Sequence, residues 1–228
     1  MKGRVDLSFV VTISIALRRP AAWLAGSLCA FCPIGVAHKA PPMDALESGV
    51  KATFCQKAIV CIDYSNLGPI ADSIIRDEVD RATAITSGIF ASARVKVQWR
   101  RVGLRSCPEA TDRTTITITL LTRTASGVRR GALAYSLLDE GQRIFVFYDR
   151  IIQVSPEFQT SLLGHVIAHE MSHILQRTPR HTVEGIMKAV WDPRDFTAMK
   201  ARPLAFTETD LRLILDGLVR HGQGCPQT

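Results

Sequence analysis

Residues 162–187 read LLGHVIAHEMSHILQRTPRHTVEGIM, and this stretch decides more about the fold than any other. Its first half has apolar residues three and four positions apart, which is the spacing of one face of a helix. His169 and His173 lie four apart within that pattern, so their side chains project from the same face, about one turn apart. Glu170 follows the first of them directly. The sequence therefore predicts a helix after Pro156 that carries two histidines and a glutamate within an apolar surface.

Two histidines at this spacing can bind one metal ion, because both imidazole nitrogens can reach a common point at ~2.0–2.1 Å. The side chain of Glu170 does not point in the same direction as the two histidines, so it cannot be a ligand beside them. It can reach a water molecule on the ion and act as a general base. Zinc suits such a site, since it acidifies water to a pKa of about 7 and polarises a carbonyl group. The alternative is a pair of hydrogen-bonded core histidines. Burying two histidines and a glutamate without partners is costly, which favours the metal.

A third ligand is required, and the residues after the helix offer one. Pro179 is expected to end the helix, His181 follows two residues later, and Gly185-Ile186-Met187 comes soon afterwards. In this order the segment resembles the metzincin clan of zinc peptidases, in which a turn, a third histidine and a methionine-containing turn follow the active-site helix. The resemblance implies one zinc ion held by His169, His173 and His181, with Glu170 as general base and Met187 as the Met-turn residue.

The function implied by the resemblance is zinc-dependent hydrolysis of peptide bonds in a protein or peptide substrate, most simply by an endopeptidase. Water activated by the metal would attack the peptide carbonyl, and Glu170 would take the proton and return it to the leaving amine. The spacing departs from the clan pattern in two respects. His181 lies twelve residues after His169 rather than ten, and Gln176 stands where the clan has a glycine.

Within the clan, the chain is most similar to matrixin-type catalytic domains, over roughly residues 57–221. GALAYS at 131–136 resembles their edge strand, IFVFYD at 144–149 the next strand, and FTETDLRLILDGL at 206–218 the closing helix. The signatures of the matrixin structural zinc, calcium sites and cysteine switch are missing from the sequence. A substrate strand is expected to pair with the edge strand, and the candidate contacts there are Gly131, Ala132, Leu133, Ala134 and Tyr135.

Other residues and functions compete with this interpretation. His165 lies one turn earlier on the same helix face and is an alternative third ligand. Glu208 could be a distant carboxylate ligand, as in thermolysin-like enzymes, although an acid in the first turn of a helix is explained more simply by the helix dipole. The main alternative function is a non-catalytic zinc-binding module for adhesion or partner binding. Such a module has no need of a base such as Glu170 and normally closes the fourth position of its zinc.

The remaining pattern predicts an α+β, metzincin-like fold: one mixed sheet of about five strands, a long helix, an active-site helix and a C-terminal helix. Residues 114–122, TTITITLLT, alternate most clearly, and Ile116, Ile118 and Leu120 are expected to face inward. Thr207 is expected to cap the last helix. Further strands are predicted at 57–63, 95–99, 131–136 and 144–148, and the long helix from near Pro69 to Ile89.

The first 37 residues resemble a targeting signal more than a folded segment. A short positive region, an apolar stretch and small residues before the expected cleavage near Ala37 predict a secretory signal peptide. A leader at 38–56 and the peptidase domain at 57–228 would follow. The protein is therefore expected to be secreted or periplasmic; the alternative is an uncleaved membrane anchor, which would be its one contact with a membrane. An oxidising compartment would allow two disulfides, in three possible connectivities, among Cys55, Cys61, Cys107 and Cys225.

The charge argues against one class of partner. The formal net charge is +7, but residues 1–40 hold five cations and one acid, which leaves about +3 for the rest of the chain. The sequence has no basic stripe with interleaved aromatic residues, so it does not predict binding to nucleic acid.

Overall fold

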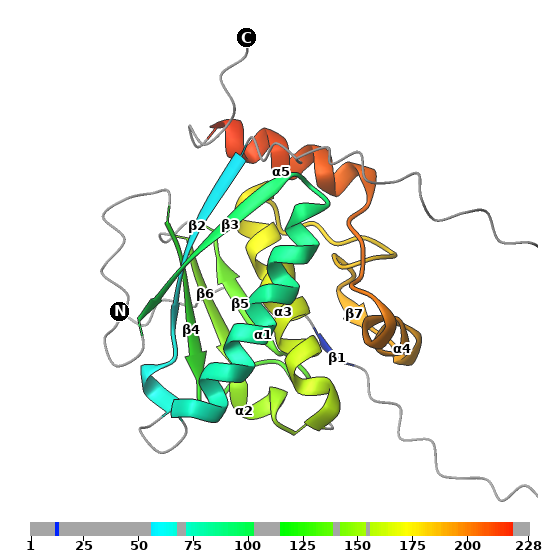
Figure 1. Cartoon of the computed structure of the whole chain (residues 1–228). Helices are drawn as coiled ribbons and strands as arrows, with labels where there is room; N and C mark the ends of the chain where they lie inside the picture. Colours follow the sequence, from blue (N-terminus) through cyan, green and yellow to red (C-terminus); the bar gives the residue numbers. More distant parts are fainter. Residues whose placement is uncertain are drawn as a thin grey trace, which may run out of the picture. The chain divides into compact units, whose positions relative to one another are not determined.

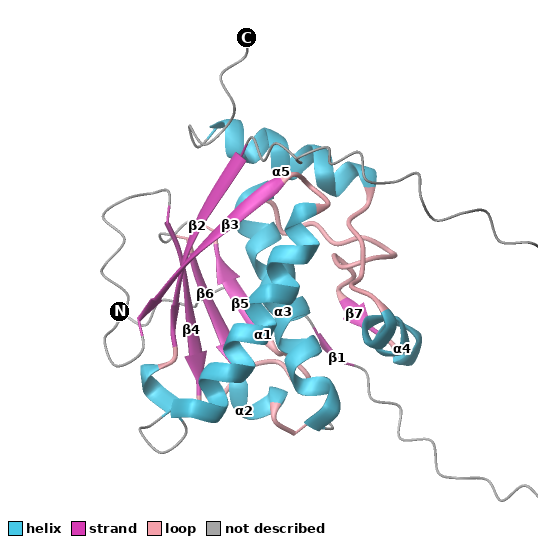
Figure 2. Ribbon diagram, in the orientation of Figure 1, coloured by secondary structure: helices cyan, strands magenta, loops and turns pink. Residues whose placement is uncertain are grey.

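The computed structural model describes residues 12–13, 56–67, 72–102, 115–138, 142–153 and 156–220. These residues form the predicted α+β fold, in which helices pack on a five-stranded mixed sheet (Figures 1 and 2). Almost all of the predicted signal and leader segments lie outside the described residues, so both stay predictions. No helix in the described part of the chain is long and apolar enough to cross a membrane.

The sheet has the spatial order β3-β2-β4-β6-β5. Neighbouring strands are parallel except at the end of this order, where β5 runs antiparallel to β6. The alternation predicted for residues 114–122 is confirmed, because Ile116, Ile118 and Leu120 are buried while the residues between them are partly exposed. The strands are β2 (Gln56–Asp63), β3 (Val95–Val102), β4 (Thr115–Leu121), β5 (Ala134–Leu137) and β6 (Arg143–Phe147).

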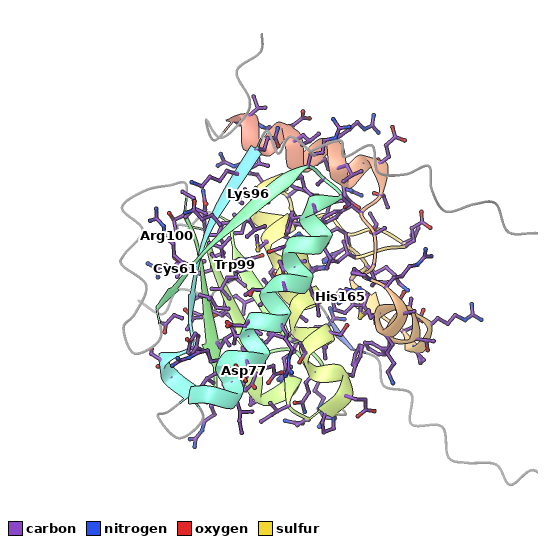
Figure 3. All side chains as sticks on the ribbon, viewed as in Figure 1. Cys61, Asp77, Lys96, Trp99, Arg100 and His165 are labelled. Atoms are coloured by element: carbon purple, nitrogen blue, oxygen red, sulfur yellow. The ribbon has the colours of Figure 1, made fainter. Side chains whose placement is uncertain are left out.

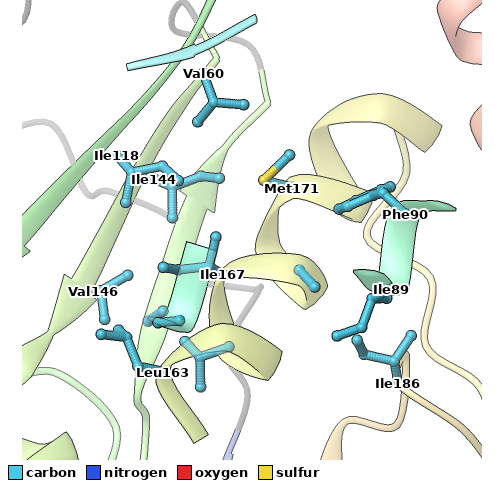
Figure 4. Packing of buried hydrophobic residues seen from close by; sticks show 14 of the residues in the cluster. Val60, Ile89, Phe90, Ile118, Ile144, Val146, Leu163, Ile167, Met171 and Ile186 are labelled. Atoms are coloured by element: carbon cyan, nitrogen blue, oxygen red, sulfur yellow. The ribbon is translucent and has the colours of Figure 1, made fainter. Parts of the chain in front are cut away.

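Two long helices, α1 (Asp72–Ala91) and α3 (Pro156–Gln176), pack with the sheet to form the core. In Figure 4, strand residues such as Ile118 and Ile144 face Ile167 of α3, while Phe90 of α1 lies on the other side of that helix. All residues of α3 from position 162 to 176 are buried. A helix enclosed on all sides is apolar around its whole circumference, so the polar residues it does carry need a specific reason to be there.

Helix α5 (Glu208–Arg220) begins after Thr207, as predicted. The backbone N–H of Asp210 donates to the Thr207 hydroxyl oxygen, and the Thr207 N–H donates to the Asp210 carboxylate, which is a reciprocal cap. The helix packs on the C-terminal end of α3 through Gly217, where an added Cβ would overlap the Leu175 carbonyl oxygen. The last helix therefore closes over the end of the helix that carries the histidines.

Three shorter elements and a small sheet complete the described fold. They are η1 (Ser65–Leu67), α2 (Tyr148–Ile151) and α4 (Pro193–Ala201), together with β1 (Thr12–Ile13) paired in parallel with β7 (Val190–Trp191).

The predicted edge strand and the strand after it have different limits in the structure. The edge strand predicted at 131–136 begins at Ala134, because Gly131 has a φ of 77°, in the left-handed region rather than the extended one. Gly131, Ala132 and Leu133 therefore precede the strand on which substrate contacts were predicted. The strand predicted to include Tyr148 ends one residue earlier, because Tyr148 opens α2 and donates its hydroxyl hydrogen to the Glu78 carboxylate at 2.6 Å.

The predicted end of the active-site helix was also wrong. The helix ends at Gln176, before Pro179, because Arg177 has a φ of 52° and turns the chain in the left-handed conformation. The turn that was expected at Pro179 is therefore made by Arg177, directly after the helix.

Candidate metal centre

Helix α3 places His169 and His173 on one face, one turn apart, and both side chains are fully buried. Their Nε2 atoms lie 3.0 Å apart, and their ring centroids lie 4.7 Å apart. The i, i+4 spacing read from the sequence thus produces two imidazoles that converge on one point.

The other nitrogen of each ring fixes its tautomer. Nδ1 of His169 donates to the Ile186 carbonyl oxygen at 2.7 Å, and Nδ1 of His173 donates to the Thr178 carbonyl oxygen at 2.9 Å. A carbonyl can only accept, so both Nδ1 atoms carry hydrogen and both Nε2 atoms of the neutral rings present lone pairs. Burial lowers the pKa of His169 well below its usual value and that of His173 to about 4, so both rings are neutral at pH 7.

Two lone pairs that face each other at 3.0 Å repel each other and form no hydrogen bond. A cation in contact with both nitrogens turns this repulsion into attraction. Histidine ligands of metals commonly donate their second ring N–H to a backbone carbonyl, as both rings do here. The pair therefore has the protonation and the orientation of metal ligands, which the alternative of two hydrogen-bonded core histidines does not explain.

The loop after α3 brings His181 to the same place. Its ring centroid lies 5.3 Å from that of His169 and 4.9 Å from that of His173. One ligand atom from each of the three histidines lies within 4.8 Å of the others. The Nε2 atom of His181 is buried without a hydrogen-bond partner, and burial lowers the pKa of this ring too. Three neutral imidazoles are a donor set that fits zinc with a fourth position open.

The predicted Met-turn contacts this group through its backbone. Ile186 supplies the carbonyl that orients His169, and the next residue, Met187, is fully buried. The Met187 carbonyl oxygen accepts a hydrogen bond at 2.9 Å from the N–H of Thr182, the residue after the third histidine. Gly185 has a φ of 72°, and an added Cβ would overlap the Ala205 carbonyl oxygen, so a glycine is needed here for both conformation and space.

Glu170 is fully buried, and neither of its carboxylate oxygens makes a hydrogen bond of ordinary geometry. Burial raises the pKa of Glu170 to about 8, and the nearby Ser136 hydroxyl offsets part of that rise. A carboxyl group in this state can hold a proton or release it close to neutral pH. A buried polar group without partners is costly, which marks it as a functional candidate.

The competing ligands lie elsewhere. His165, labelled on α3 in Figure 3, donates from Nδ1 to the Ser161 carbonyl oxygen at 2.7 Å, and its Nε2 accepts from the Leu204 N–H at 3.1 Å. Both of its ring nitrogens are therefore engaged in structural hydrogen bonds. Glu208 is exposed in the first turn of α5 and does not belong to the histidine group.

Two residues that sequence reasoning missed also belong to the surroundings of the site. Ser136 lies on β5, where it was read only as part of an edge strand, and its buried hydroxyl faces the region of Glu170. Arg180 immediately precedes His181 and forms an ion pair with Asp210 of α5 at 2.5 Å. No local pattern could indicate either relation, because each joins segments about thirty residues apart in the sequence.

Comparisons with known proteins found similarity in fold. No family model matches the chain, and no curated protein matches it significantly. Archaemetzincin from Methanopyrus kandleri shares 15% identity over 75% of this chain and 99% of its own, with a TM-score of 0.47. A zinc-dependent peptidase from Methanocorpusculum labreanum has 10% sequence identity to this chain, over 69% of this chain and 100% of the peptidase, with a TM-score of 0.47. Archaemetzincin from Archaeoglobus fulgidus has 15% sequence identity to this chain, over 69% of this chain and 99% of its own, with a TM-score of 0.44. The finer relation to matrixins stays a prediction.

Proposed function

We propose that this protein is a zinc-dependent metallopeptidase of the metzincin type, which hydrolyses peptide bonds with Glu170 as general base. The observation that carries the proposal is the convergence of one ring nitrogen from each of three histidines, two of which turn Nε2 lone pairs toward each other, next to a buried carboxyl group. His169, His173 and His181 would hold the zinc. When bound, the ion supplies Lewis acidity toward a carbonyl group and toward water.

Glu170 suits the proton transfers that amide hydrolysis requires. The reaction adds water across the C–N bond, so the carbonyl carbon gains a hydroxyl group, and the amine leaves with a proton. A single carboxyl group can accept that proton from water and deliver it to the leaving nitrogen. Burial raises the pKa of Glu170, which strengthens its carboxylate as a proton acceptor. The Ser136 hydroxyl would hold the carboxyl group in orientation from the strand side.

The substrate we propose is a peptide in an extended conformation that adds a strand to the sheet. β5 lies at the edge of the described sheet, so one side of its backbone is free to pair with such a chain. Ser136 on this strand lies near Glu170, which connects the edge to the proposed chemistry. Of the predicted substrate contacts, Ala134 and Tyr135 lie within the strand.

We also propose that the protein acts outside the reducing cytosol, in a secreted or periplasmic location. The support is that Cys61 is disulfide-bonded, since disulfides persist mainly in oxidising compartments. The other cysteines lie outside the described residues.

The test separates metal binding from catalysis. Purified protein should contain about one zinc per chain by elemental analysis and should cleave a pool of fluorogenic peptides. Glu170→Gln should keep the zinc and lose activity by about 10²–10⁴-fold, which is what a positioned general base contributes. Glu208→Gln is the matched control, an exposed acid that should change neither property.

Three results would count against parts of this proposal. Loss of zinc in Glu170→Gln would make Glu170 a ligand instead. Unchanged hydrolysis in that variant would remove its role as base. Bound zinc with no hydrolysis of any peptide would favour the non-catalytic zinc module.

A further inference from the structure

The three histidines are not held in the same way. His169 and His173 lie on a buried helix, and each donates its Nδ1 hydrogen to a backbone carbonyl oxygen. Among the described residues, no hydrogen bond holds the His181 ring, and its residue is only partly buried. The position of this third imidazole must therefore come from the backbone that carries it.

The backbone is anchored on both sides of His181, after it by the Thr182 N–H bond to the Met187 carbonyl oxygen and before it by Arg180. The Arg180 side chain forms the ion pair with Asp210 at 2.5 Å, and its backbone N–H donates to the Thr178 hydroxyl oxygen at 3.3 Å. Asp210 is itself fixed, because it is buried and accepts from both the N–H and the hydroxyl group of Thr207. The residue directly before His181 is thus fastened to the start of α5.

We propose that Arg180 is a positioning residue for the metal centre, whose ion pair with Asp210 holds His181 where it can complete the ligand set. This inference rests on the proposed zinc site, and Arg180 is not one of the three residues that could hold the metal. The ion pair restrains the residue before His181, whose ring no hydrogen bond holds within the described part of the chain.

Because Arg180 is positively charged, two explanations of its role predict opposite changes in zinc affinity when it is removed. A cation beside the site repels a metal ion, so if only charge mattered, removing it would tighten zinc binding. If Arg180 positions His181, removing it frees the loop and weakens zinc binding. Loss of an outer residue that orients a ligand typically costs 10–100-fold in metal affinity.

The experiment measures zinc affinity of the full chain by competition with a chromophoric chelator. Arg180→Met should weaken binding by about 10–100-fold, and the visible absorption of the cobalt-substituted protein should change because one ligand is lost. Arg177→Met is the matched control, since it removes an exposed cation from the same loop that makes no ion pair in the described structure. It should leave both measurements unchanged. Arg180→Lys, which keeps the charge, should recover part of the affinity.

A double-mutant cycle tests whether the effect passes through His181. In a His181→Ala background, Arg180→Met should weaken zinc binding no further. An equal loss in both backgrounds, or equal or tighter binding by Arg180→Met itself, would overturn the inference. If Arg180→Met does not fold, Asp210→Asn breaks the same ion pair and carries the same expectation. A wild-type chain that binds no zinc would overturn the proposed function, and this inference with it.

Discussion

At the scale of single residues, hydrogen bonds to the backbone decide what the centre can bind. The Ile186 and Thr178 carbonyl groups place hydrogen on Nδ1 of two rings, so the facing Nε2 atoms carry lone pairs. His165 lies on the same helix and differs from them only in its partners, since its Nε2 already accepts from a backbone N–H. The same residue type is therefore a ligand candidate in one environment and a structural element in another.

Replacing His173 by Ala should abolish stoichiometric zinc, because it removes one of two convergent ligands that the helix holds rigidly. The measurement is elemental analysis after dialysis against a weak chelator, with folding checked by circular dichroism. Zinc retained at one equivalent in this variant would disprove the ligand assignment. Glu208→Gln in the same assay should bind zinc normally; loss of metal there would restore the thermolysin-like alternative.

At the scale of secondary-structure elements, the centre depends on how α5 closes over the end of α3. The two helices approach each other at Gly217, where the absence of a side chain lets the Leu175 backbone come close. This contact and the Arg180–Asp210 ion pair fix the same region, from which the His181 loop leaves α3. The packing of one helix end thus determines the path of the loop that carries the third ligand.

Gly217→Ala should destabilise the protein by about 1–3 kcal/mol or more, the usual cost of overpacking, because the new methyl group meets backbone that cannot rotate away. Gly88→Ala in α1 is the matched control. An added Cβ there has no neighbour within 4 Å, so the change should stabilise the protein by about 0.5–1 kcal/mol through helix propensity. Urea unfolding of both variants gives the free energies, and a Gly217 variant as stable as wild type would refute the close packing.

At the scale of the whole molecule, the proposed zinc site and the core share the same helix. α3 contributes Ile167 and Met171 to the interior and two of the three candidate ligands, His169 and His173, to the centre. An ion that binds the folded chain and not the unfolded one adds its binding free energy to stability. Metal content and resistance to unfolding should therefore change together.

Chelation should lower the free energy of unfolding by about 2.7 kcal/mol relative to protein with free zinc at 100 times the dissociation constant. Urea midpoints with zinc and with chelator measure the difference. His173→Ala should show no such difference, because it has no site for the ion to fill. A chelator effect of equal size in that variant would place the stabilising metal elsewhere in the molecule.

The sequence by itself determined the parts of the protein that depend on local periodicity. The spacing of His169 and His173 placed two candidate ligands on one helix face, the alternation at 114–122 indicated which side of β4 is buried, and Thr207 marked the start of the last helix. Each of these follows from the 3.6-residue repeat of a helix, the two-residue repeat of a strand or the chemistry of a cap.

Only the tertiary structure decided which distant groups meet. In the structure, Arg177 rather than Pro179 makes the turn after α3, and Arg180 pairs with Asp210. Ser136 lies near Glu170, and both ring nitrogens of His165 have hydrogen-bond partners. These relations join segments that are separate in the sequence, and their energies come from burial and from partners supplied by other elements. These contacts cannot be read from the periodicity of the sequence. A local pattern specifies which face of an element is buried but not which residues pack against it.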